Sequence, residues 1–600
     1  MADRRKDWLR DFVPGTFLDH RAARIALSDF INRELILFSM ADNVRSIPCA
    51  IDGLKPGHRK ILFACFKRNL KSEIKVAQLA GYVAEHSAYH HGEQSLCATI
   101  VGLAQNFIGS NNINLLEPNG QFGTRLQGGK DAASARYIFT NLSAFARLLY
   151  REEDDALLNF LNEDGQSIEP EWYLPILPMV LVNGGEGIGT GWSTFIPNYN
   201  PADLCKNLKR MLDDEEPVEM HPWYHGFRGE IVPQGRDKYV VKGRWTRNGD
   251  VLEVTELPVG SWTQTYKEML ETMMAATEPE VKEFSEYHTD TTVHFRITLS
   301  PSTSGLSEAE LEKKFKLSNS MSVGNLVTFD RTGRIHKYSD PLGILRDFYD
   351  IRLEYYHKRK EHLTAALERA WTILDNKARF IREVISGAIV VAKRSKENIV
   401  LQLQASKYFT TAEDSDAGTG YGGYEYLLSM PIHSLTLERI AKLEEERNGK
   451  EGELKALLAK NAKDLWRADL DEFGLKWNEY VANAVASSAG GTTGKKGKAA
   501  SSASVAKGKK KALMIESDEE EEAEMMEEEE NYKPKATTKR TKNAAASAKQ
   551  TTLSFVTPST STATSNSNTQ SAAATTVVVD DDDMELPLAQ RIAKMLGKQV

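Results

Sequence analysis

One short segment places a cation directly beside a residue that could attack a phosphate. In GGKDAASARYIFTNL, Arg136 precedes Tyr137. A tyrosine hydroxyl has an unperturbed pKa of about 10, so it becomes a useful nucleophile only where cations stabilise its phenolate and the phosphoryl transition state. The guanidinium of Arg136 is always charged and matches phosphate oxygens in a fork. The dipeptide alone carries little weight, because tyrosines beside arginines are usually residues at the edge of a core.

Two adjacent histidines, His90 and His91, lie upstream in AYHHGEQSL. On a helix or strand, neighbouring side chains point to different faces, so this pair is not expected to share a metal ion. Donation of a hydrogen bond from one imidazole to a phosphate oxygen is the favoured chemistry. No metal site is predicted from these residues.

A basic segment precedes the histidines. Between residues 45 and 75 there are eight Lys and Arg residues against two acidic ones. Four of them, Arg45, Lys55, Arg59 and Lys60, surround a DGLKPG turn. The turn leads into an amphipathic helix predicted over RKILFACFKRNL, which is the layout of a helix-turn-helix entry. Such a local patch indicates affinity for nucleic acid even though the whole chain has a net charge of −8.

The bulk composition sets broad limits. A length of 600 residues predicts about three or four domains, and no apolar run is long enough for a bilayer span. The N-terminus lacks the apolar stretch of a signal peptide. The four cysteines are scattered without a CxxC pair, which favours a reducing compartment and argues against a zinc site.

The chain separates into zones that position these groups. Residues 176–340 contain short β-rich runs such as VLEVTELPV and TVHFRITL, typical of an α+β domain. Apolar residues then recur at helical spacing from Leu363 to Ile385, and a second helical stretch is predicted at about 435–458. Two helices flanking an insert favour an antiparallel coiled coil with a small domain at its far end, and a helical bundle packed on the main body is the alternative.

The last zone, residues 487–600, is low-complexity sequence with acidic blocks and too few apolar residues to form a core. We expect it to be disordered. Its basic clusters at Lys507–Lys511 and Lys533–Lys542 fit a nuclear import signal or loose DNA contacts, and a merely solvated tail explains each cluster almost as well.

Many segments together resemble the breakage-reunion region of eukaryotic DNA topoisomerase II, a type IIA enzyme. The resemblance covers about residues 3–480 in family order. It is carried by segments that include SDFINRELILFSMADNVRSIP, LKSEIKVAQLAGYVAE, GLAQNFIGSNNINLL, GQFGTRLQGGKDAASARYIF, EPEWYLPILPMVLVNGGEGIGTGWST and PIHSLTLERIAKLEEE.

The resemblance implies a multidomain α+β chain with five parts. These are a linker from a missing Toprim region (1–35), a winged-helix domain with the catalytic tyrosine (36–175), an α/β tower domain (176–340), a long antiparallel coiled-coil arm (341–486) and a disordered charged tail (487–600). The arm would carry a terminal dimer gate in an insert near 387–430, through which the protein would form a homodimer.

The resemblance also implies roles for single residues. Tyr137 would form a 5′-phosphotyrosyl link to double-stranded DNA, Arg136 would stabilise the transition state, and His90 and His91 match the active-site histidine pair. Further residues match the active-site or DNA-proximal set: Arg45, Asp52, Lys55, Arg59 and Lys60.

A glycine-rich stretch, NGGEGIGTGW, lacks the GK[ST] ending of a phosphate loop. In the family this segment places an isoleucine, here Ile188, as a wedge between base steps, and a small apolar side chain on a glycine-rich loop suits partial unstacking. KLSNSMSVGN resembles a DNA-contacting segment of the tower, which adds Lys316, Ser318, Asn319, Ser320 and Asn325.

The complete enzyme of this family is a nuclear, ATP-hydrolysing isomerase that cleaves, passes and reseals duplexes to relax, decatenate and unknot DNA. Its ATPase module and its Toprim fold, which holds Mg²⁺, have no counterpart in this sequence, so Mg²⁺ and ATP would be needed only by the complete enzyme. We therefore expect a fragment, a truncated gene model or a split protein that cleaves poorly without a Toprim/ATPase partner.

Two other classes remain open. The first is a non-catalytic dimeric DNA-bending protein, in which Tyr137 is structural and Ile188 does the work. The second is a structural coiled-coil protein, for which the basic zone would be surplus. A bacterial gyrase-like protein is disfavoured, because the tail is a low-complexity segment rather than a folded β-rich module.

Overall fold

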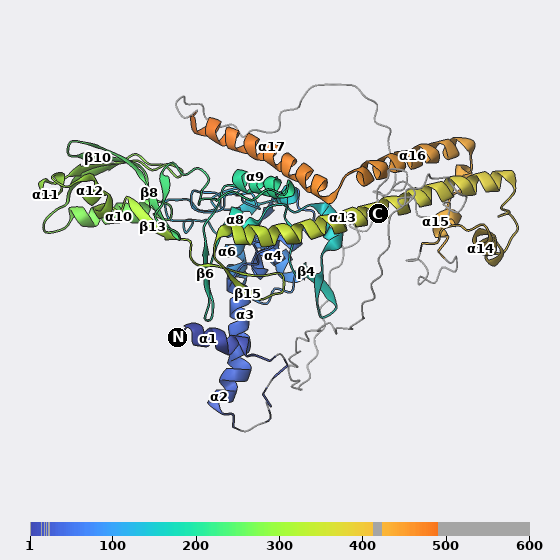
Figure 1. Ribbon diagram of the computed structural model, residues 1–600, viewed down its shortest axis with the longest axis horizontal. Helices are drawn as coiled ribbons and strands as arrows, with labels where there is room; N and C mark the ends of the chain where they lie inside the picture. The colour runs from blue at the N-terminus through green and yellow to red at the C-terminus, as the bar shows by residue number, and fades with distance from the viewer. Residues whose placement is uncertain are drawn as a thin grey trace, which may run out of the picture. The chain divides into compact units, whose positions relative to one another are not determined.

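The computed structural model describes residues 2–13, 15–16, 18–19, 21, 24–411 and 423–489, with side chains to residue 484 (Figure 1). The chain divides into one unit that contains residues 1–480 and a second over 481–570. Every contact given below lies within residues 1–480. The predicted tail and its basic clusters lie outside the described residues, apart from the end of one helix. None of the described helices is long and apolar enough to cross a bilayer.

The N-terminal region is helical. It consists of α1 (Ala2–Arg10), α2 (Leu27–Phe30), a π-helical turn (Ile31–Leu35) and α3 (Ile36–Ser46). Trp8 Nε1 donates to Asn32 Oδ1 at 2.9 Å and so ties α1 to the turn. Several large apolar side chains of this region are exposed: Leu27, Phe30, Leu37, Phe38 and Val44.

Three helices form the first core. They are α4 (Pro56–Lys67), α5 (Val76–His86) and α6 (Glu93–Ala104). Pro56 lies in the first turn of α4, where a missing N–H costs nothing. Ile61, Leu79 and Ile100 are fully buried between the helices. The predicted amphipathic helix after the DGLKPG turn is α4. A short antiparallel pair, β1 (Ile74–Lys75) with β2 (Phe139–Thr140), lies at the start of α5.

Short elements follow. They are α7 (Ala146–Leu149), a 3₁₀ turn η2 (Glu152–Leu157), the hairpin β3 (Phe160–Glu163) and β4 (Gln166–Pro170), α8 (Met179–Val182), the hairpin β5 (Gly185–Ile188) and β6 (Ser193–Ile196), and α9 (Pro201–Leu212). The two hairpins carry side chains that matter for the candidate site.

A four-stranded antiparallel sheet has its own core. Its order is β11 (Val281–Glu286), β12 (Phe295–Leu299), β10 (Val251–Glu256) and β9 (Arg244–Asn248). Side chains alternate along β10, so that Leu252 and Val254 are buried. They pack with Tyr266 of α10 (Thr263–Met274) and Leu311 of α12 (Glu308–Lys314), and α11 (Pro301–Ser304) follows β12. The predicted β-rich runs are strands β10 and β12.

Two smaller sheets complete the region before the long helices. One has the order β13 (Ser318–Ser322), β8 (Lys238–Lys242) and β7 (Glu230–Pro233). The other is the hairpin β14 (Leu326–Phe329) and β15 (Ile335–Tyr338). Ala50 N donates to Phe329 O at 2.9 Å, which joins this hairpin to the turn before α4.

The helix α13 (Pro341–Ser386) and α16 (Leu437–Ala459) lie side by side in Figure 1. Ile381 near the end of α13 packs with Ile440 near the start of α16, whereas Leu367 packs with Leu454, so the pair is antiparallel. Between the two helices, α14 (Lys396–Ala405), α15 (Glu425–Leu428) and a short 3₁₀ turn (Ile432–Ser434) form a cluster. Its core comprises Phe380, Ile389, Leu403, Tyr408, Tyr424 and Leu427.

The last helix, α17 (Ala462–Ala489), packs on the base of α13 rather than along the arm. The fully buried indole of Trp466 stacks on Tyr349 and Tyr356 with ring centroids 5.3 Å apart in both cases. Its Nε1 donates to Ile176 O at 3.1 Å. The predicted arm range 341–486 therefore contains a helix whose described contacts are with the body.

A buried ion cluster joins the base of α13 to its neighbours. The Asp154 carboxylate accepts from Arg352 at 2.6 Å and from Arg359 Nε at 2.7 Å. Arg359 also donates to Asp469 of α17 at 2.7 Å. Burial by itself raises the pKa of Asp154, but the charges and hydrogen bonds of the two arginines outweigh it and hold the pKa below its usual value.

Asp154→Asn is predicted to lower the free energy of unfolding by about 3–5 kcal/mol at pH 7, because two buried guanidinium groups lose their counter-charge. The folded pKa is depressed, so the contribution of Asp154 is present above the unfolded value of about 3.9 and is lost as the pH falls through the folded value. Denaturant titrations from pH 7 to pH 3 should show the difference shrinking below about pH 4. Exposed Asp350→Asn on the same helix is the control, and an equal loss in both variants would contradict the prediction.

Candidate functional site

Tyr137 lies in a turn directly before β2, and its side chain is 75% exposed. Its backbone N–H donates to Ser134 O at 2.9 Å, which closes the turn. Arg136 is exposed beside it. Among the residues that the structure describes, neither side chain forms a hydrogen bond or ion pair. Both groups are therefore open to a large substrate.

The start of α5 holds this turn on both sides. Ala77 N donates to Ala135 O and Val76 N donates to Ile138 O, each at 3.1 Å. Ile138 is buried next to the exposed Tyr137. Because these contacts use backbone groups and the buried neighbour, the position of the phenol is set without any bond to the phenol itself.

His90 and His91 lie in the loop between α5 and α6, not on a helix or strand. His90 Nε2 lies 2.8 Å from Glu163 Oε1 at the end of β3. His91 packs edge-to-face on Tyr89 with ring centroids 5.4 Å apart. The hairpin β3–β4 thus orients one imidazole and leaves the other exposed. Sequence patterns did not identify Glu163, because no local signal links it to a histidine 73 residues away.

Asp52 and Arg59 form a buried ion pair. Arg59 Nε donates to Asp52 Oδ2 at 2.7 Å and Nη2 donates to Oδ1 at 3.2 Å. The Asp52 carboxylate also accepts from the backbone N–H groups of Leu54 and Tyr173, each at 3.0 Å. Asp52 is fully buried and Arg59 is 7% exposed. As described, the pair holds the DGLKPG turn on α4 and does not face solvent.

The three other cations of the basic segment have protein partners. Lys55 Nζ donates to Glu186 O at 2.7 Å, and burial lowers its pKa. Lys60 Nζ lies 2.9 Å from the buried Glu169 carboxylate. Arg45 is exposed and pairs with Asp42 at 3.1 Å on the same helix. Arg45 is the most accessible of them, since it is 45% exposed at the side chain.

Ile188 ends β5 and is 80% exposed, although it is apolar. The tip of its hairpin is fixed to α3, because Asn43 Nδ2 donates to Thr190 O at 3.2 Å and Thr190 Oγ1 donates to Asp42 at 3.1 Å. Gly187 lies so close to α3 that a Cβ there would be 1.9 Å from Ser46 O. Sequence patterns did not reveal Asp42, Asn43 and Thr190, which are ordinary polar residues in their own segments.

The segment from Lys316 to Asn325 contains strand β13, where Ser318 and Ser320 pair with β8. Asn319 Nδ2 donates to Ser261 Oγ at 2.9 Å. Asn325 Nδ2 donates to Ser193 Oγ at 3.0 Å, which joins this segment to the hairpin of Ile188. The structure thus brings Lys55, Ile188 and Asn325 to the β5–β6 hairpin, while Tyr137 and the histidines lie at the two ends of α5.

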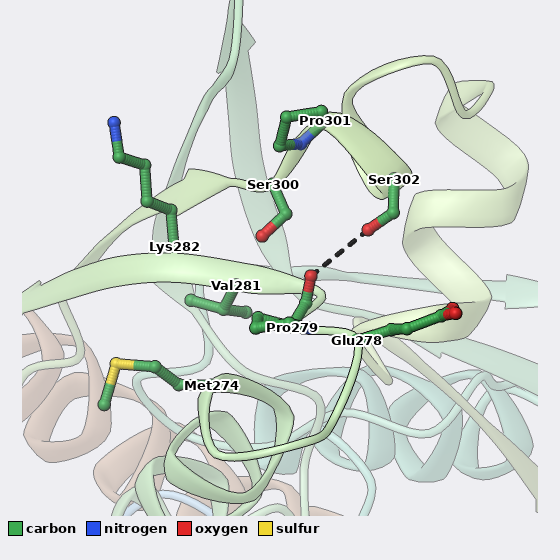
Figure 2. A pocket seen from close by; sticks show the side chains of 8 residues that line it. All are labelled: Met274, Glu278, Pro279, Val281, Lys282, Ser300, Pro301 and Ser302. Atoms are coloured by element: carbon green, nitrogen blue, oxygen red, sulfur yellow. Dashed lines mark hydrogen bonds between the residues drawn. The ribbon is translucent and has the colours of Figure 1, made fainter.

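Two further features bear on ligands. In the described ranges there is no group of three or more His, Cys, Asp or Glu side chains that could hold a metal ion. A shallow hollow lies on the four-stranded sheet between Met274, Lys282 and Pro301, with Ser302 Oγ donating to Pro279 O at 3.2 Å (Figure 2). None of the predicted site residues lines this hollow.

A family model for the A-type chain of DNA gyrase and topoisomerase IV matches residues 45–471. A second one, described as "C-terminal associated domain of TOPRIM", matches residues 1–43. The first match covers more than half of the chain. The chain therefore belongs to the DNA gyrase/topoisomerase IV family of A-type chains.

Particular relatives are eukaryotic. The chain is 46% identical over 539 residues to DNA topoisomerase 2 of Candida albicans, covering 80% of this chain and 36% of that protein. It is 47% identical over 513 residues to DNA topoisomerase 2-beta of Homo sapiens, covering 78% and 32%. The chain thus spans about a third of the length of the curated relatives it matches.

A solved structure supports the same kinship. The chain is similar to the Plasmodium falciparum topoisomerase II DNA-binding, cleavage and re-ligation domain, with a TM-score of 0.74 and 42% identity, covering 81% of this chain and 69% of that one. The mixed helix and strand fold is therefore that of a topoisomerase II cleavage and re-ligation domain.

Gly187→Ala is predicted to destabilise the chain by about 1–3 kcal/mol and to loosen residues 185–193, because the added methyl group would collide with the backbone of α3. Denaturant unfolding and hydrogen exchange of that peptide measure both effects. Gly81→Ala in α5 is the control, since a Cβ there meets nothing within 4 Å. Equal stability of the two variants would show that the hairpin is not tightly docked.

Proposed function

We propose that this chain performs the DNA cleavage and religation of a type IIA DNA topoisomerase, with Tyr137 as the nucleophile. One observation carries the proposal. An exposed Tyr137–Arg136 pair lies on a turn that α5 holds on both sides, in a chain of the DNA gyrase/topoisomerase IV family. The substrate is double-stranded DNA.

The proposed step exchanges one phosphodiester for another. The Tyr137 hydroxyl oxygen attacks a backbone phosphorus, a 5′-phosphotyrosyl bond forms and the bond to the 3′ oxygen breaks. The 3′ oxygen leaves as a hydroxyl, and the phenolic proton passes to water. Attack by the same 3′ hydroxyl reverses the step, so resealing needs no external energy.

Arg136 is proposed to stabilise the charge that develops on the phosphate oxygens, because its exposed guanidinium is adjacent to the attacking phenol. The exposed His91 and the Glu163-bound His90 are proposed to donate hydrogen bonds to phosphate oxygens. Burial, followed by the charges of Lys55 and Arg59, lowers the pKa of nearby His58 to about 4. His58 is therefore neutral at pH 7 and adds no charge to this region.

The remaining residues are proposed to bind the duplex. Direct contact is proposed for the exposed Arg45, for the Ile188 wedge and for the polar tower segment with Lys316, Ser318, Asn319, Ser320 and Asn325. Lys55 touches the wedge hairpin and would contact DNA beside it. The buried Asp52–Arg59 pair and the Lys60–Glu169 pair support a positioning role for these residues.

The finer architecture is part of the proposal. It comprises a Toprim linker (1–35), a winged-helix domain (36–175), a tower (176–340), a coiled-coil arm with a dimer gate near 387–430 (341–486) and a charged tail (487–600). Exposed Val390, Leu401, Phe409 and Ile432 in the insert support a homodimer through that gate. The complete nuclear enzyme would pass one duplex through another with Mg²⁺ and ATP, supplied by a Toprim/ATPase region in the same protein or in trans.

A covalent adduct tests the proposed chemistry. The chain is mixed with a Toprim-containing fragment of a relative, Mg²⁺ and supercoiled plasmid, and the complex is trapped with detergent. We expect a protein–DNA adduct with the wild-type chain and none with Tyr137→Phe, because only this substitution removes the attacking oxygen. Tyr287→Phe is the matched control, since Tyr287 is also exposed. Absence of an adduct from the wild-type chain, or its survival in Tyr137→Phe, would refute the proposal.

The second candidate function is DNA bending without cleavage, and the exposed Ile188 favours it. Ile188→Ala is predicted to reduce the bend of a bound duplex, measured by energy transfer between dyes at its two ends. Stability should change by less than about 0.5 kcal/mol, because the side chain is exposed. Tyr137→Phe should leave the bend unchanged in both functions. If only bending is found and the adduct assay stays negative, the non-catalytic function is the correct one.

A further inference from the structure

The loop that precedes Tyr137 is closed on itself. The Asp131 carboxylate accepts from Thr124 N at 2.9 Å and from Thr124 Oγ1 at 2.6 Å, and Gly129 N donates to Thr124 O at 2.9 Å. Gln105 Nε2 donates to Phe122 O at 2.9 Å from the end of α6. Residues 122–131 therefore form a defined loop that begins fifteen residues before the proposed nucleophile.

One side chain of this loop leaves it and enters the four-stranded sheet. Arg125 Nη2 donates to Glu256 Oε1 at 2.6 Å, where β10 ends, and the two residues are only 4% and 2% exposed. The same carboxylate oxygen accepts from Leu257 N at 3.0 Å. An ion pair buried to this degree holds only in a narrow geometry, because each charge has given up its water.

The contact around the pair is extensive. Gln264 N at the start of α10 donates to Leu126 O at 3.0 Å. Gly128, with a φ of +62°, lies against the Trp262 indole so closely that a Cβ would come within 2.3 Å of it. Phe107 packs edge-to-face on the same indole, with ring centroids 5.8 Å apart. The loop is thus bound to residues 256–264 by charge, backbone and ring contacts.

Little slack remains between this contact and the phenol. Ala133 N donates to Gln121 O at 2.9 Å, and Tyr137 N donates to Ser134 O at 2.9 Å. Ala77 of α5 holds Ala135. A shift of the sheet relative to the helical core would therefore be passed along the chain to the turn of Tyr137.

We propose that Arg125 and Glu256 are a positioning pair that couples the four-stranded sheet to the nucleophile, so that DNA engaged by the sheet region sets the orientation of the Tyr137 phenol. The proposal rests on the proposed function of Tyr137. The pair does not touch the reacting atoms. It acts through the loop, and a merely stabilising pair would affect folding without affecting the turn of Tyr137.

The test compares two variants with the wild-type chain. Glu256→Gln leaves Arg125 buried without a counter-charge. The double variant Arg125→Met with Glu256→Leu removes both charges, and such apolar replacements usually preserve folding. Glu286→Gln, which breaks the more exposed Lys267–Glu286 pair of the same sheet region, is the matched control.

Three readouts are taken: adduct formation at saturating DNA in the Toprim-supplemented mixture, the dissociation constant for duplex DNA, and hydrogen exchange of residues 121–137. In the double variant we expect adduct formation to slow at least tenfold, DNA affinity to change less than twofold, and exchange of 121–137 to rise while that of β10 and β12 stays constant. The control should match the wild-type chain in all three.

Adduct formation within twofold of wild type in the double variant, or a loss matched by weaker DNA binding, would overturn the proposal. Unchanged exchange of residues 121–137 would overturn it as well. The exchange measurement needs no adduct. If the wild-type chain forms no adduct, the function of Tyr137 fails, whereas the coupling of loop and sheet is still decided by exchange.

Discussion

The carboxylate of Asp52 accepts four hydrogen bonds in a site that water does not reach, two from Arg59 and one each from Leu54 and Tyr173. A buried carboxylate is tolerable only when its acceptor positions are filled in this way. The bonds fix the DGLKPG turn on the first turn of α4 and on the chain near residue 173. Lys55 follows directly and grips the β5–β6 hairpin, so the exposed hairpin depends on a charge pair buried beneath it.

Local signals were enough for the elements around this pair. Proline in a first helical turn and an amphipathic pattern predicted α4, and alternating apolar residues predicted β10 and β12. Each of these signals lies within about a dozen residues, where backbone preference and side-chain periodicity act together. The helical stretch near 435–458 was recognised for the same reason and is α16.

Burial and long-range partners could not be derived in this way. A count of charges groups Asp52 and Arg59 with Arg45, although the first two are buried and the third is exposed. The pairing of His90 with Glu163 spans two elements that no local pattern connects. The helix α17 has a periodicity that suits an arm, and only the buried Trp466 contacts show that it packs on the body. Such facts depend on tertiary proximity, which composition does not encode.

The most exposed side chains of the candidate site share one mode of support. Tyr137 and Ile188 are 75% and 80% exposed, and each sits on a turn or hairpin fixed by backbone groups and close-packed glycines or buried neighbours. A group that must meet a duplex cannot also be held by its own side-chain contacts, because DNA would have to displace them first. Rigidity therefore has to come from the residues beside it. This explains why the functional side chains look unsupported while Ile138, Gly187 and Asn43 next to them are tightly packed.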